Sequence, residues 1–397
     1  MTAALVVGTP SAAFGAEPPP GTDPCQGLST PCYTPQQIQA AYGADTLQAQ
    51  GLTGQGMTIV TGYGQGSTTI QQDLDTYSAA TGLPPTTLQF VQSGSPTPSP
   101  VPSGELDETT TDVQAIHTMA PGAQIVVVQS DTIQNRFQGY LQAVQQYGAD
   151  VVSMSFDYGE ATEQQNGTIA ALDPVISQII AAGATMVASS GDYGGLSSGR
   201  LGTLWPTSNP AVVSVGGTVL DLDASGQRQS PDVGWHSSSG GISAVYPRPS
   251  YQNGVQSVVG SGRGTPDVAM MATGFLSYQP GRGKFVTIDG TSVSAPLFAG
   301  VVAMAAQQAG QGLGDVHQTL YGIPFPYSSG SGLVDVTSGT SDVNGQHGST
   351  VPPPNVPGFT GWTAGVGYDL VTGLGTVQAD ALVPVLAGAQ PDPPPQQ

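Results

Sequence analysis

Residues 290–296 read Gly290-Thr291-Ser292-Val293-Ser294-Ala295-Pro296, and they are the most informative segment of the chain. A Gly-Thr turn places the hydroxyl of Ser292 directly before an apolar run at 297–306 that has the pattern of a helix. The amides at a helix N-terminus stabilise negative charge on a nearby oxygen. Ser292 is therefore placed as an exposed nucleophile, with helix amides available for the charge that develops during its attack.

The rest of the chain alternates between strand patterns and helix patterns. We expect strands at 57–62, 87–91, 124–129, 150–155, 184–189 and 212–215, and helices at 35–42, 68–81, 109–119, 132–147 and 168–182. Such alternation is typical of a parallel sheet covered by helices on both faces. We therefore predict an α/β fold whose ligand site lies at the carboxyl ends of the strands.

The composition favours one large domain adapted to acid. Apolar runs extend from Met57 to Leu386 of 397 residues, enough for a single sizeable core. Seven Lys and Arg against 27 Asp and Glu give a net charge of −20, which argues against nucleic acid and anionic membranes as partners. Only 9% of residues are charged, so protonation in acid leaves few bases to repel one another. No apolar run reaches the roughly 18 residues of a membrane span.

The N-terminal lead, residues 1–32, is rich in Pro and Gly and holds both cysteines. Cys25 and Cys32 lie seven positions apart and would close a short disulfide loop in an oxidising compartment; the alternative is two free thiols. We expect the folded domain to span 33–386 and a Pro-rich tail to occupy 387–397.

A nucleophilic serine needs a base, and carboxylates are the candidates here. None of the histidines, His117, His236, His317 and His347, stands in a subtilisin-like sequence context. Glu108 and Asp112 are spaced i, i+4, which puts both on one helix face about 5–6 Å apart. Carboxylates this close do not both ionise readily, so the pair can hold a proton for transfer. The alternative is two solvated carboxylates that favour the helix dipole.

Asp192 follows the apolar strand expected at 184–189 and the small residues Ser190 and Gly191. An oxyanion needs a hydrogen-bond donor at the end of this strand, and a protonated Asp192 can supply one, whereas an ionised Asp192 would repel the oxyanion. The alternative is an ordinary turn aspartate after glycine.

Together these features resemble the sedolisin family, the serine-carboxyl peptidases with a subtilisin-like fold. Gly-Thr-Ser-x-x-x-Pro also presents the serine of subtilisins, but the chain lacks their Asp on the first core strand and their His-Gly-Thr-His helix. The resemblance runs from Tyr33 to Thr376. Its other matching segments are Ala120-Pro121-Gly122-Ala123, Ser190-Gly191-Asp192, Ser214-Val215-Gly216-Gly217-Thr218, Tyr246-Pro247-Arg248-Pro249-Ser250-Tyr251 and Gly262-Arg263-Gly264-Thr265-Pro266-Asp267-Val268.

The resemblance implies an acid-active endopeptidase on a subtilisin-like parallel sheet. It assigns Ser292 as nucleophile, Glu108 as general base and acid, Asp112 as its orienting partner and Asp192 as protonated oxyanion donor. The alternatives are a tripeptidyl or dipeptidyl exopeptidase of the same family, a non-catalytic binding protein on a peptidase scaffold, and a neutral subtilisin with an unrecognised His–Asp pair. The intact set of four residues argues against the binding protein.

A second group of residues has the composition of a calcium site. Asp335-Val336 and Gly365-Val366-Gly367-Tyr368-Asp369 offer hard oxygen ligands, which suit Ca²⁺ rather than zinc, although Asp and Gly are also common loop formers. The resemblance implies one Ca²⁺, held by the side chains of Asp335 and Asp369 and by the carbonyls of Val336, Gly365 and Gly367. It also makes 151–156 the strand that pairs with an extended substrate.

The chain departs from the family at two places. Thr61 stands where many relatives carry an acidic residue that extends the catalytic hydrogen-bond network. Relatives also carry a large N-terminal prodomain, whereas this chain starts close to the mature domain, and Met1 to Ala16 is apolar without a basic flank, as in a signal-peptide remnant. We expect a secreted monomer that acts on polypeptides.

Overall fold

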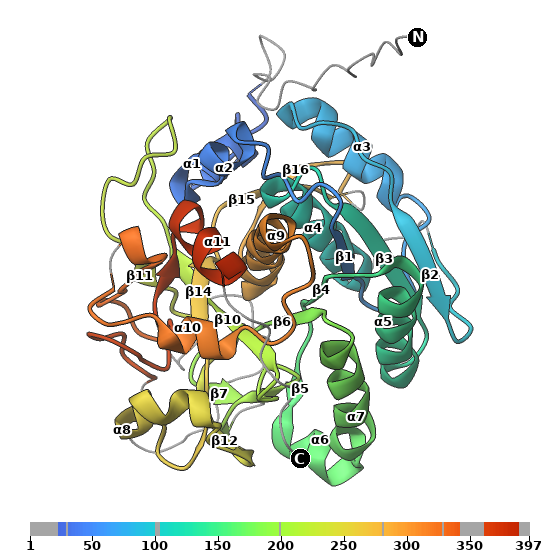
Figure 1. Ribbon diagram of the computed structural model, residues 1–397. Helices are drawn as coiled ribbons and strands as arrows, with labels where there is room; N and C mark the ends of the chain where they lie inside the picture. Colours follow the sequence, from blue (N-terminus) through green and yellow to red (C-terminus); the bar gives the residue numbers. More distant parts are fainter. Residues whose placement is uncertain are drawn as a thin grey trace, which may run out of the picture.

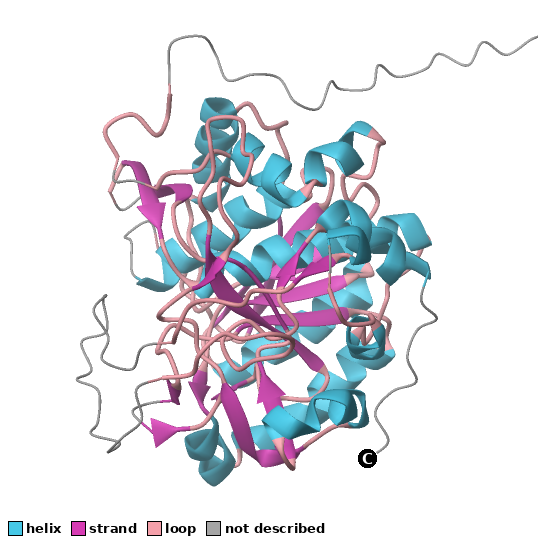
Figure 2. Ribbon diagram, turned by 90° about the vertical axis from the view of Figure 1, so that its left-hand side faces the viewer, coloured by secondary structure: helices cyan, strands magenta, loops and turns pink. Residues whose placement is uncertain are grey.

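The structure, a computed structural model, describes residues 23–28, 31–99, 104–197, 200–279, 282–327, 329–341 and 361–388. Its centre is a ten-stranded sheet in the order β17-β18-β14-β10-β6-β4-β1-β3-β2, with β11 paired to β10. The strands from β2 to β18 run parallel, whereas β11 and β17 are antiparallel to their neighbours. Figures 1 and 2 show helices packed around this sheet, which confirms the predicted α/β class.

The strands of the sheet and of the smaller pairs have the following bounds. The sheet contains β1 (Thr58–Thr61), β2 (Gln89–Ser93), β3 (Gln124–Ser130), β4 (Val151–Met154), β6 (Thr185–Ser189), β10 (Val212–Val219), β11 (Val233–Gly234), β14 (Val268–Met271), β17 (Leu333–Val334) and β18 (Thr376–Val377). The pairs are β5 (Tyr158–Gly159) with β9 (Leu204–Trp205), β7 (Leu196–Ser197) with β8 (Arg200–Leu201), β12 (Gly241–Pro247) with β13 (Gly262–Thr265), and β15 (Phe275–Gln279) with β16 (Lys284–Ile288).

Helices cover both faces of the sheet, because successive side chains of a strand point to opposite faces. Ile59 joins the core beneath α4, α9 and α11, and Val60 joins the core beneath α5 and α7. The central helix α9 is buried from Val293 to Ala306. The helices are α1 (Pro35–Tyr42), α2 (Ala44–Ala49), α3 (Ile70–Thr81), α4 (Gly104–Met119), α5 (Ile133–Tyr147), α6 (Glu160–Asn166), α7 (Thr168–Ala181), α8 (Gln256–Val259), α9 (Thr291–Ala309), α10 (His317–Gly322), α11 (Ala379–Gly388) and the 3-10 turns η1 (Ser250–Val255) and η2 (Ser329–Ser331).

Most predicted elements exist within two residues of their expected ends. α1 starts at a capping box between Thr34 and Gln37 and ends at Gly43, whose φ of 71° suits glycine. The predicted start of α4 at residue 109 is wrong, because the helix begins at Gly104. α6 was not predicted, since its short polar sequence has no apolar period.

The predicted disulfide can also be compared with the fold. Cys25 and Cys32 form a disulfide with an S–S distance of 2.03 Å, so the alternative of two free thiols is excluded. Within the described ranges, no helix has the length and apolar character to cross a membrane. The signal-peptide remnant at Met1 to Ala16 and residues 389–397 of the tail lie outside the described residues.

Candidate active site

Ser292 is the second residue of α9, which Gly290 precedes as the N-cap. Its side chain is partly exposed, whereas the helix is buried from Val293 onwards. The amide of Ser292 belongs to the first turn, where amides have no carbonyl partner inside the helix. The serine hydroxyl and this amide therefore stand together at the surface end of a rigid, buried helix.

The base predicted for Ser292 lies beside it. α4 packs against α9, and the hydroxyl of Ser292 is hydrogen-bonded to the Glu108 carboxyl. Burial raises the pKa of Glu108 well above its usual value, and the charge of Asp112 raises it further. Glu108 Oε1 and Asp112 Oδ1 are both shielded from solvent and lack any other partner among the described residues, as two carboxyls that share one proton would be.

Asp112 is held by two hydroxyls, one at the end of β1 and one directly after β4. Burial raises its pKa to about 7, while hydrogen bonds from Ser155 and Thr61 oppose this rise because they favour the ionised form. The hydroxyl of Thr61, at the end of β1, donates to Asp112 Oδ2 over 2.9 Å. At this position, the chain thus has a neutral donor that stabilises an ionised Asp112.

Pro296 explains a contact on the other side of Ser292. An amide at position 296 would donate to the carbonyl of Ser292 four residues back, but proline has no amide hydrogen. The hydroxyl of Ser155 takes this place and lies 3.4 Å from the Ser292 carbonyl oxygen. Ser155 therefore stands between the backbone of the candidate nucleophile and Asp112.

Asp192 is fixed by Thr291, the first residue of α9. The amide and the hydroxyl of Thr291 both donate to Asp192 Oδ1 over 2.8 Å, and the hydroxyl accepts from the Gly191 amide over 3.1 Å. These bonds leave Oδ2 free to point elsewhere. Burial raises the pKa of Asp192, Thr291 lowers it, and the charge of Asp289 raises it further.

The free Oδ2 of Asp192 and the Ser292 amide border the same small space. A Cβ atom on Gly290 would lie 3.0 Å from Asp192 Oδ2 and 3.7 Å from the Ser292 amide nitrogen. Glycine leaves this space open, and any side chain there would fill it. An oxygen atom beside Ser292 can thus meet a backbone donor and, when Asp192 is protonated, a carboxyl donor.

The structure reveals one acidic residue that the sequence did not single out. Asp157 follows the cleft strand expected at 151–156 and interacts electrostatically with both Glu108 and Asp192. Burial, and next the charge of Asp192, raise the pKa of Asp157 to about 7. Its position directly after that strand was the available signal, since ligand groups gather at the carboxyl ends of parallel strands.

The sequence and the fold were compared with known families, proteins and solved structures. The family model described as the subtilase family matches residues 102–319. Kumamolisin of Bacillus sp. (strain MN-32) is 30% identical over 92% of this chain and 66% of that protein. A solved Pseudomonas sedolisin, described as a serine-carboxyl proteinase complexed with two molecules of pseudo-iodotyrostatin, has a TM-score of 0.76 at 27% identity and covers 89% of this chain and 97% of the solved one.

The chain belongs to the sedolisin family. The sedolisin of Pseudomonas sp. (strain 101) is 29% identical over 87% of this chain and 60% of that protein. A probable tripeptidyl-peptidase of Arthroderma benhamiae is 32% identical over 58% of this chain and 41% of that protein. The chain therefore spans at most about two thirds of the length of these curated sedolisin relatives.

The histidines of this sedolisin do not replace the carboxyls. His117 is buried with its Nε2 at 2.7 Å from the Pro84 carbonyl oxygen, and His317 is buried between Asp267 and Asp315. His236 packs against Trp235, and His347 lies outside the described residues. The Ser292 hydroxyl is instead hydrogen-bonded to Glu108, the base that the sedolisin resemblance implies.

The five residues predicted for calcium lie around one loop of the sedolisin fold. Both carboxylate oxygens of Asp335 accept from the Gly367 amide, at 3.1 and 3.0 Å, and Asp369 Oδ2 accepts from the Gly365 amide at 3.0 Å. Asp335 and Val336 directly follow β17. Across the described part of the chain, no cluster of three or more His, Cys, Asp or Glu side chains could hold a metal, so most ligands would have to be backbone oxygens.

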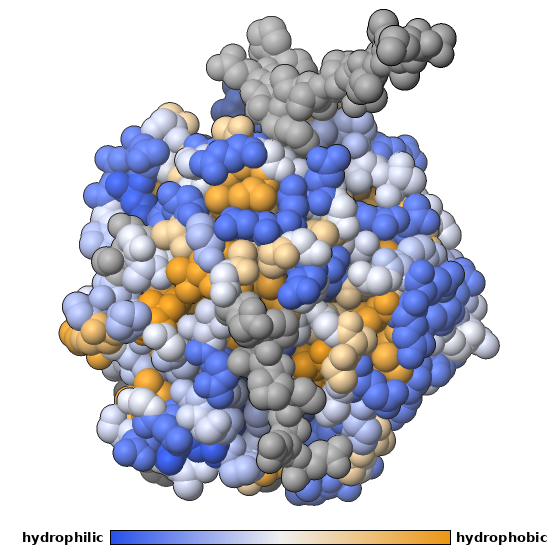
Figure 3. Space-filling view, viewed as in Figure 1, coloured by the Kyte–Doolittle hydropathy of each residue, from blue (hydrophilic) through white to orange (hydrophobic). Residues whose placement is uncertain are grey.

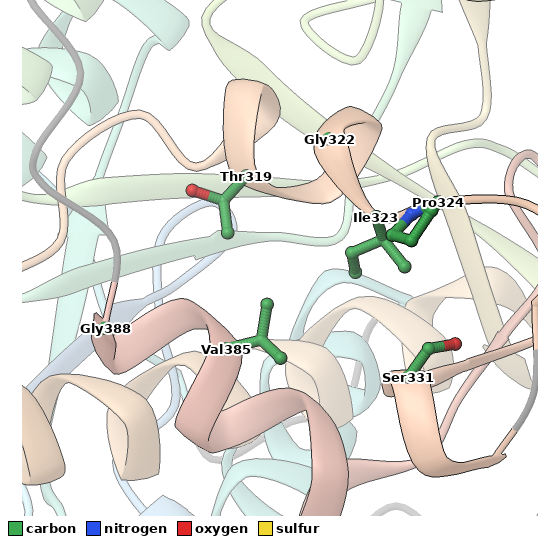
Figure 4. A pocket seen from close by; sticks show the side chains of 7 residues that line it. All are labelled: Thr319, Gly322, Ile323, Pro324, Ser331, Val385 and Gly388. Atoms are coloured by element: carbon green, nitrogen blue, oxygen red, sulfur yellow. The ribbon is translucent and has the colours of Figure 1, made fainter.

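A pocket of about 480 Å³ opens between α10 and α11 (Figure 4). Its lining consists of Thr319, Gly322, Ile323, Pro324, Ser331, Val385 and Gly388. None of them is charged, and none belongs to the site predicted from the sequence. The pocket therefore has no group that could serve acid–base chemistry, and the residues around Ser292 are the better candidate active site.

Proposed function

We propose that this sedolisin hydrolyses peptide bonds in acid as a serine-carboxyl endopeptidase, through an acyl-enzyme on Ser292. The observation that carries the proposal is the hydrogen bond between the Ser292 hydroxyl and a Glu108 carboxyl that is itself paired with Asp112. A non-catalytic scaffold has no need to retain a buried carboxyl pair at a serine, since such burial is costly.

In the proposed first step, Ser292 Oγ attacks the peptide carbonyl carbon while its proton moves to the ionised Glu108 carboxylate. Glu108 then returns this proton to the amine as the C–N bond breaks, which leaves the acyl group on Ser292. A water molecule reverses the sequence: Glu108 takes its proton, the ester bond breaks and Ser292 regains its hydrogen. Asp112 orients Glu108 and exchanges the shared proton with it.

The carbonyl oxygen becomes negative at each tetrahedral intermediate. In our proposal, it enters the space beside Gly290 and accepts from the Ser292 amide and from protonated Asp192 Oδ2. Loss of one such donor costs on the order of 2.7–4 kcal/mol of transition-state stabilisation. Because Asp192 donates only while it is protonated, this step favours acid.

We further propose one Ca²⁺ at the loop 365–369. The Asp335 and Asp369 carboxylates and the carbonyls of Val336, Gly365 and Gly367 would hold it, and the supporting observation is that both carboxylates already border this loop. Hard oxygen donors of this kind fit calcium. The ion would supply positive charge between two carboxylates, neither of which forms an ion pair with a basic side chain within the described ranges.

We also propose that the protein is secreted and monomeric. The Cys25–Cys32 disulfide supports an oxidising compartment, where such bonds persist. The low content of basic residues supports a polypeptide substrate over nucleic acid or an anionic membrane.

The test is hydrolysis of a denatured protein between pH 2.5 and 8 by this chain and by Ser292→Ala, with product lengths read by mass spectrometry. We expect internal cuts, confined to acid and absent in the variant. Products shortened from the N-terminus by two or three residues at a time would instead indicate an exopeptidase, the activity in the name of the Arthroderma relative. Equal hydrolysis by Ser292→Ala would remove Ser292 as the nucleophile.

A further inference from the structure

Arg136 is a buried arginine on α5, on the side of the sheet opposite to α4 and α9. Only 4% of it is exposed, and within the described ranges it forms no ion pair with a carboxylate. Its Nε is shielded from solvent and has no hydrogen-bond partner in the same part of the chain. A guanidinium stays charged in proteins, and burying a charge without a counter-ion is costly. Stability alone therefore does not explain this arginine.

Aromatic rings take the place of a carboxylate around this cation. The guanidinium carbon of Arg136 lies 4.5 Å from the ring centroid of Tyr63 and 4.6 Å from that of Phe156. Its Nη1 also donates to the Tyr158 hydroxyl over 3.3 Å. The rings of Tyr63 and Phe156 stack on each other, with centroids 5.7 Å apart. Because a cation is attracted to both ring faces, Arg136 holds the two rings together.

These two rings belong to the segments that hold Asp112. Tyr63 lies two residues after Thr61, the last residue of β1. Phe156 directly follows Ser155, the first residue after β4. The hydroxyls of Thr61 and Ser155 are the two that bond to the Asp112 carboxyl. Arg136 thus joins the two places from which Asp112 receives its donors.

The segment after β1 also contacts the helix that carries the base. Thr109, the residue after Glu108 on α4, accepts from the Tyr63 amide over 3.1 Å and donates to the Tyr63 carbonyl over 3.3 Å. From the other side, the Tyr140 hydroxyl of α5 donates to the Gly62 carbonyl over 2.6 Å. A shift of Tyr63 would therefore be passed on to the helix turn that bears Glu108.

We propose that Arg136 is a positioning residue: by holding together the rings that follow β1 and β4, it keeps the hydroxyls of Thr61 and Ser155 at Asp112. The inference rests on the proposed function and adds a residue on which its rate depends. Hydrogen bonds weaken steeply when their geometry changes, so a small separation of the two segments would deprive Asp112 of a donor. Arg136 acts only through these segments, because it is buried.

Arg136→Met separates this role from a purely structural one, since methionine is a long apolar side chain without charge. Apolar replacement of buried charge is often neutral or stabilising, so Tm of the variant should be at or above that of the parent. With one peptide substrate at pH 5, kcat should fall about tenfold while KM stays within about twofold. An unchanged kcat would refute the inference.

A double-mutant cycle tests the route through Asp112. In Thr61→Val/Ser155→Ala, Asp112 has lost both hydroxyls, so adding Arg136→Met should lower kcat by less than about twofold. A further loss of about tenfold in this background would show that Arg136 acts by another route, and the inference would be wrong.

Arg228→Met is the matched control. Arg228 also lies over a ring, with its guanidinium carbon 4.9 Å from the Tyr42 centroid, but it is ion-paired with Asp232 at 2.7 Å. Its replacement leaves Asp232 unpaired, so Tm should fall while kcat is unchanged. A loss of kcat as large as that in Arg136→Met would show that removal of either arginine has the same effect, which contradicts a specific role for Arg136.

Crystal structures of the parent and of Arg136→Met test the inference without activity. We expect the hydroxyl of Thr61 or that of Ser155 to leave hydrogen-bonding distance of Asp112 in the variant. If both contacts are retained, the inference is overturned. The proposed function is tested separately: equal hydrolysis by the parent and by Ser292→Ala would refute it, while the crystal structures would still decide what Arg136 positions.

Discussion

A single hydroxyl, that of Ser155, lies between the nucleophile and the carboxyl pair of the candidate active site. It lies within hydrogen-bonding reach of the Asp112 carboxyl and of the Ser292 carbonyl that Pro296 leaves without an amide. A hydroxyl has one hydrogen and can donate to only one of them at a time. Ser155 is thus a positioning residue that couples the backbone of the nucleophile to the charge of the carboxyl pair.

Replacement of Ser155 by alanine should lower kcat roughly threefold to tenfold, the effect of one lost hydrogen bond. The bond from Ser155 lowers the pKa of Asp112, so its loss should raise that pKa and move the acidic limb of the pH profile to higher pH. Ser153→Ala is the matched control, because Ser153 is a buried serine of β4, two residues before Ser155, and its hydroxyl has no partner within the described ranges. Identical profiles for both variants would remove Ser155 from the network.

Asp192→Asn should extend activity toward alkaline pH. The asparagine Oδ1 can still accept from Thr291, which directs its amide nitrogen to the position of Oδ2, where it donates at every pH. In the parent, the donor is lost as pH rises through the raised pKa of Asp192. We expect the alkaline limb of kcat/KM to shift upward, as measured with one peptide substrate from pH 3 to 8.

Asp289→Asn should move the alkaline limb of the pH profile in the opposite direction. Its charge raises the pKa of Asp192, so removing it should lower that pKa and move the alkaline limb to lower pH. If both substitutions left the limb in place, a group other than Asp192 would control the loss of activity.

At the scale of elements, a buried ionic cluster fastens α10 to the loop between β13 and β14. Asp267 bonds Arg263 at 2.5 Å and His317 Nε2 at 3.2 Å, and the ring of Tyr251 stacks on His317 with centroids 4.5 Å apart. Burial lowers the pKa of His317, but the charges of Asp315 and Asp267 outweigh it and raise the pKa to about 9. His317 is therefore a cation in the folded protein across the acid and neutral range.

This cluster should make the fold sensitive to alkali. Since the pKa of His317 is higher in the folded than in the unfolded chain, its contribution is complete below about pH 6.5 and is lost as pH rises through about 9. The linked loss is on the order of 3 kcal/mol. We expect the midpoint of urea unfolding to fall between pH 7.5 and 9.5 in the parent and to fall much less in His317→Gln, because Asp112 and Asp157, whose pKa values are raised to about 7, have largely ionised below this range.

His117→Gln is the control, because His117 is also buried but its pKa is lowered, whereas that of His317 is raised. Burial lowers the pKa of His117 to about 4, so its effect on stability falls on the acid side, and its removal should leave the alkaline decline unchanged. An alkaline decline that persists in His317→Gln would assign it to a group outside this cluster.

The elements also show why the sequence predicted some features and missed others. Strands β1, β3 and β6 were predictable because each is a short apolar run, and α1 because Thr34 and Gly43 mark its ends. The start of α4 was missed because its first residues lack an apolar period. Glu108 and Asp112 were found from their spacing. Asp157 could have been suggested by its place directly after the strand expected at 151–156, but its interaction with Asp192 joins distant segments of the chain and has no local pattern.

For the whole molecule, the surface is polar without being highly charged. Figure 3 shows hydrophilic residues interspersed with apolar patches on one face, while only 9% of all residues are charged. Polar but uncharged side chains must therefore supply much of this hydrophilicity. In acid the carboxylates lose charge and seven Lys and Arg remain, so self-repulsion stays small and the fold can persist where the proposed chemistry operates.

The proposed calcium ion should add to the stability of the whole fold. Asp335 follows β17 at the edge of the sheet and Asp369 closes the loop 365–369, so an ion between them would tie a surface loop to the sheet. Free Ca²⁺ at a hundred times its dissociation constant would raise the free energy of unfolding by about 2.7 kcal/mol. A chelator should therefore lower Tm by roughly 3–4 °C in scanning calorimetry, and added Ca²⁺, but not Mg²⁺, should restore it. Asp335→Asn/Asp369→Asn should abolish the response, whereas Asp380→Asn on α11 should keep it. If the chelator leaves Tm of the parent unchanged, these two aspartates serve only to accept the loop amides of Gly365 and Gly367.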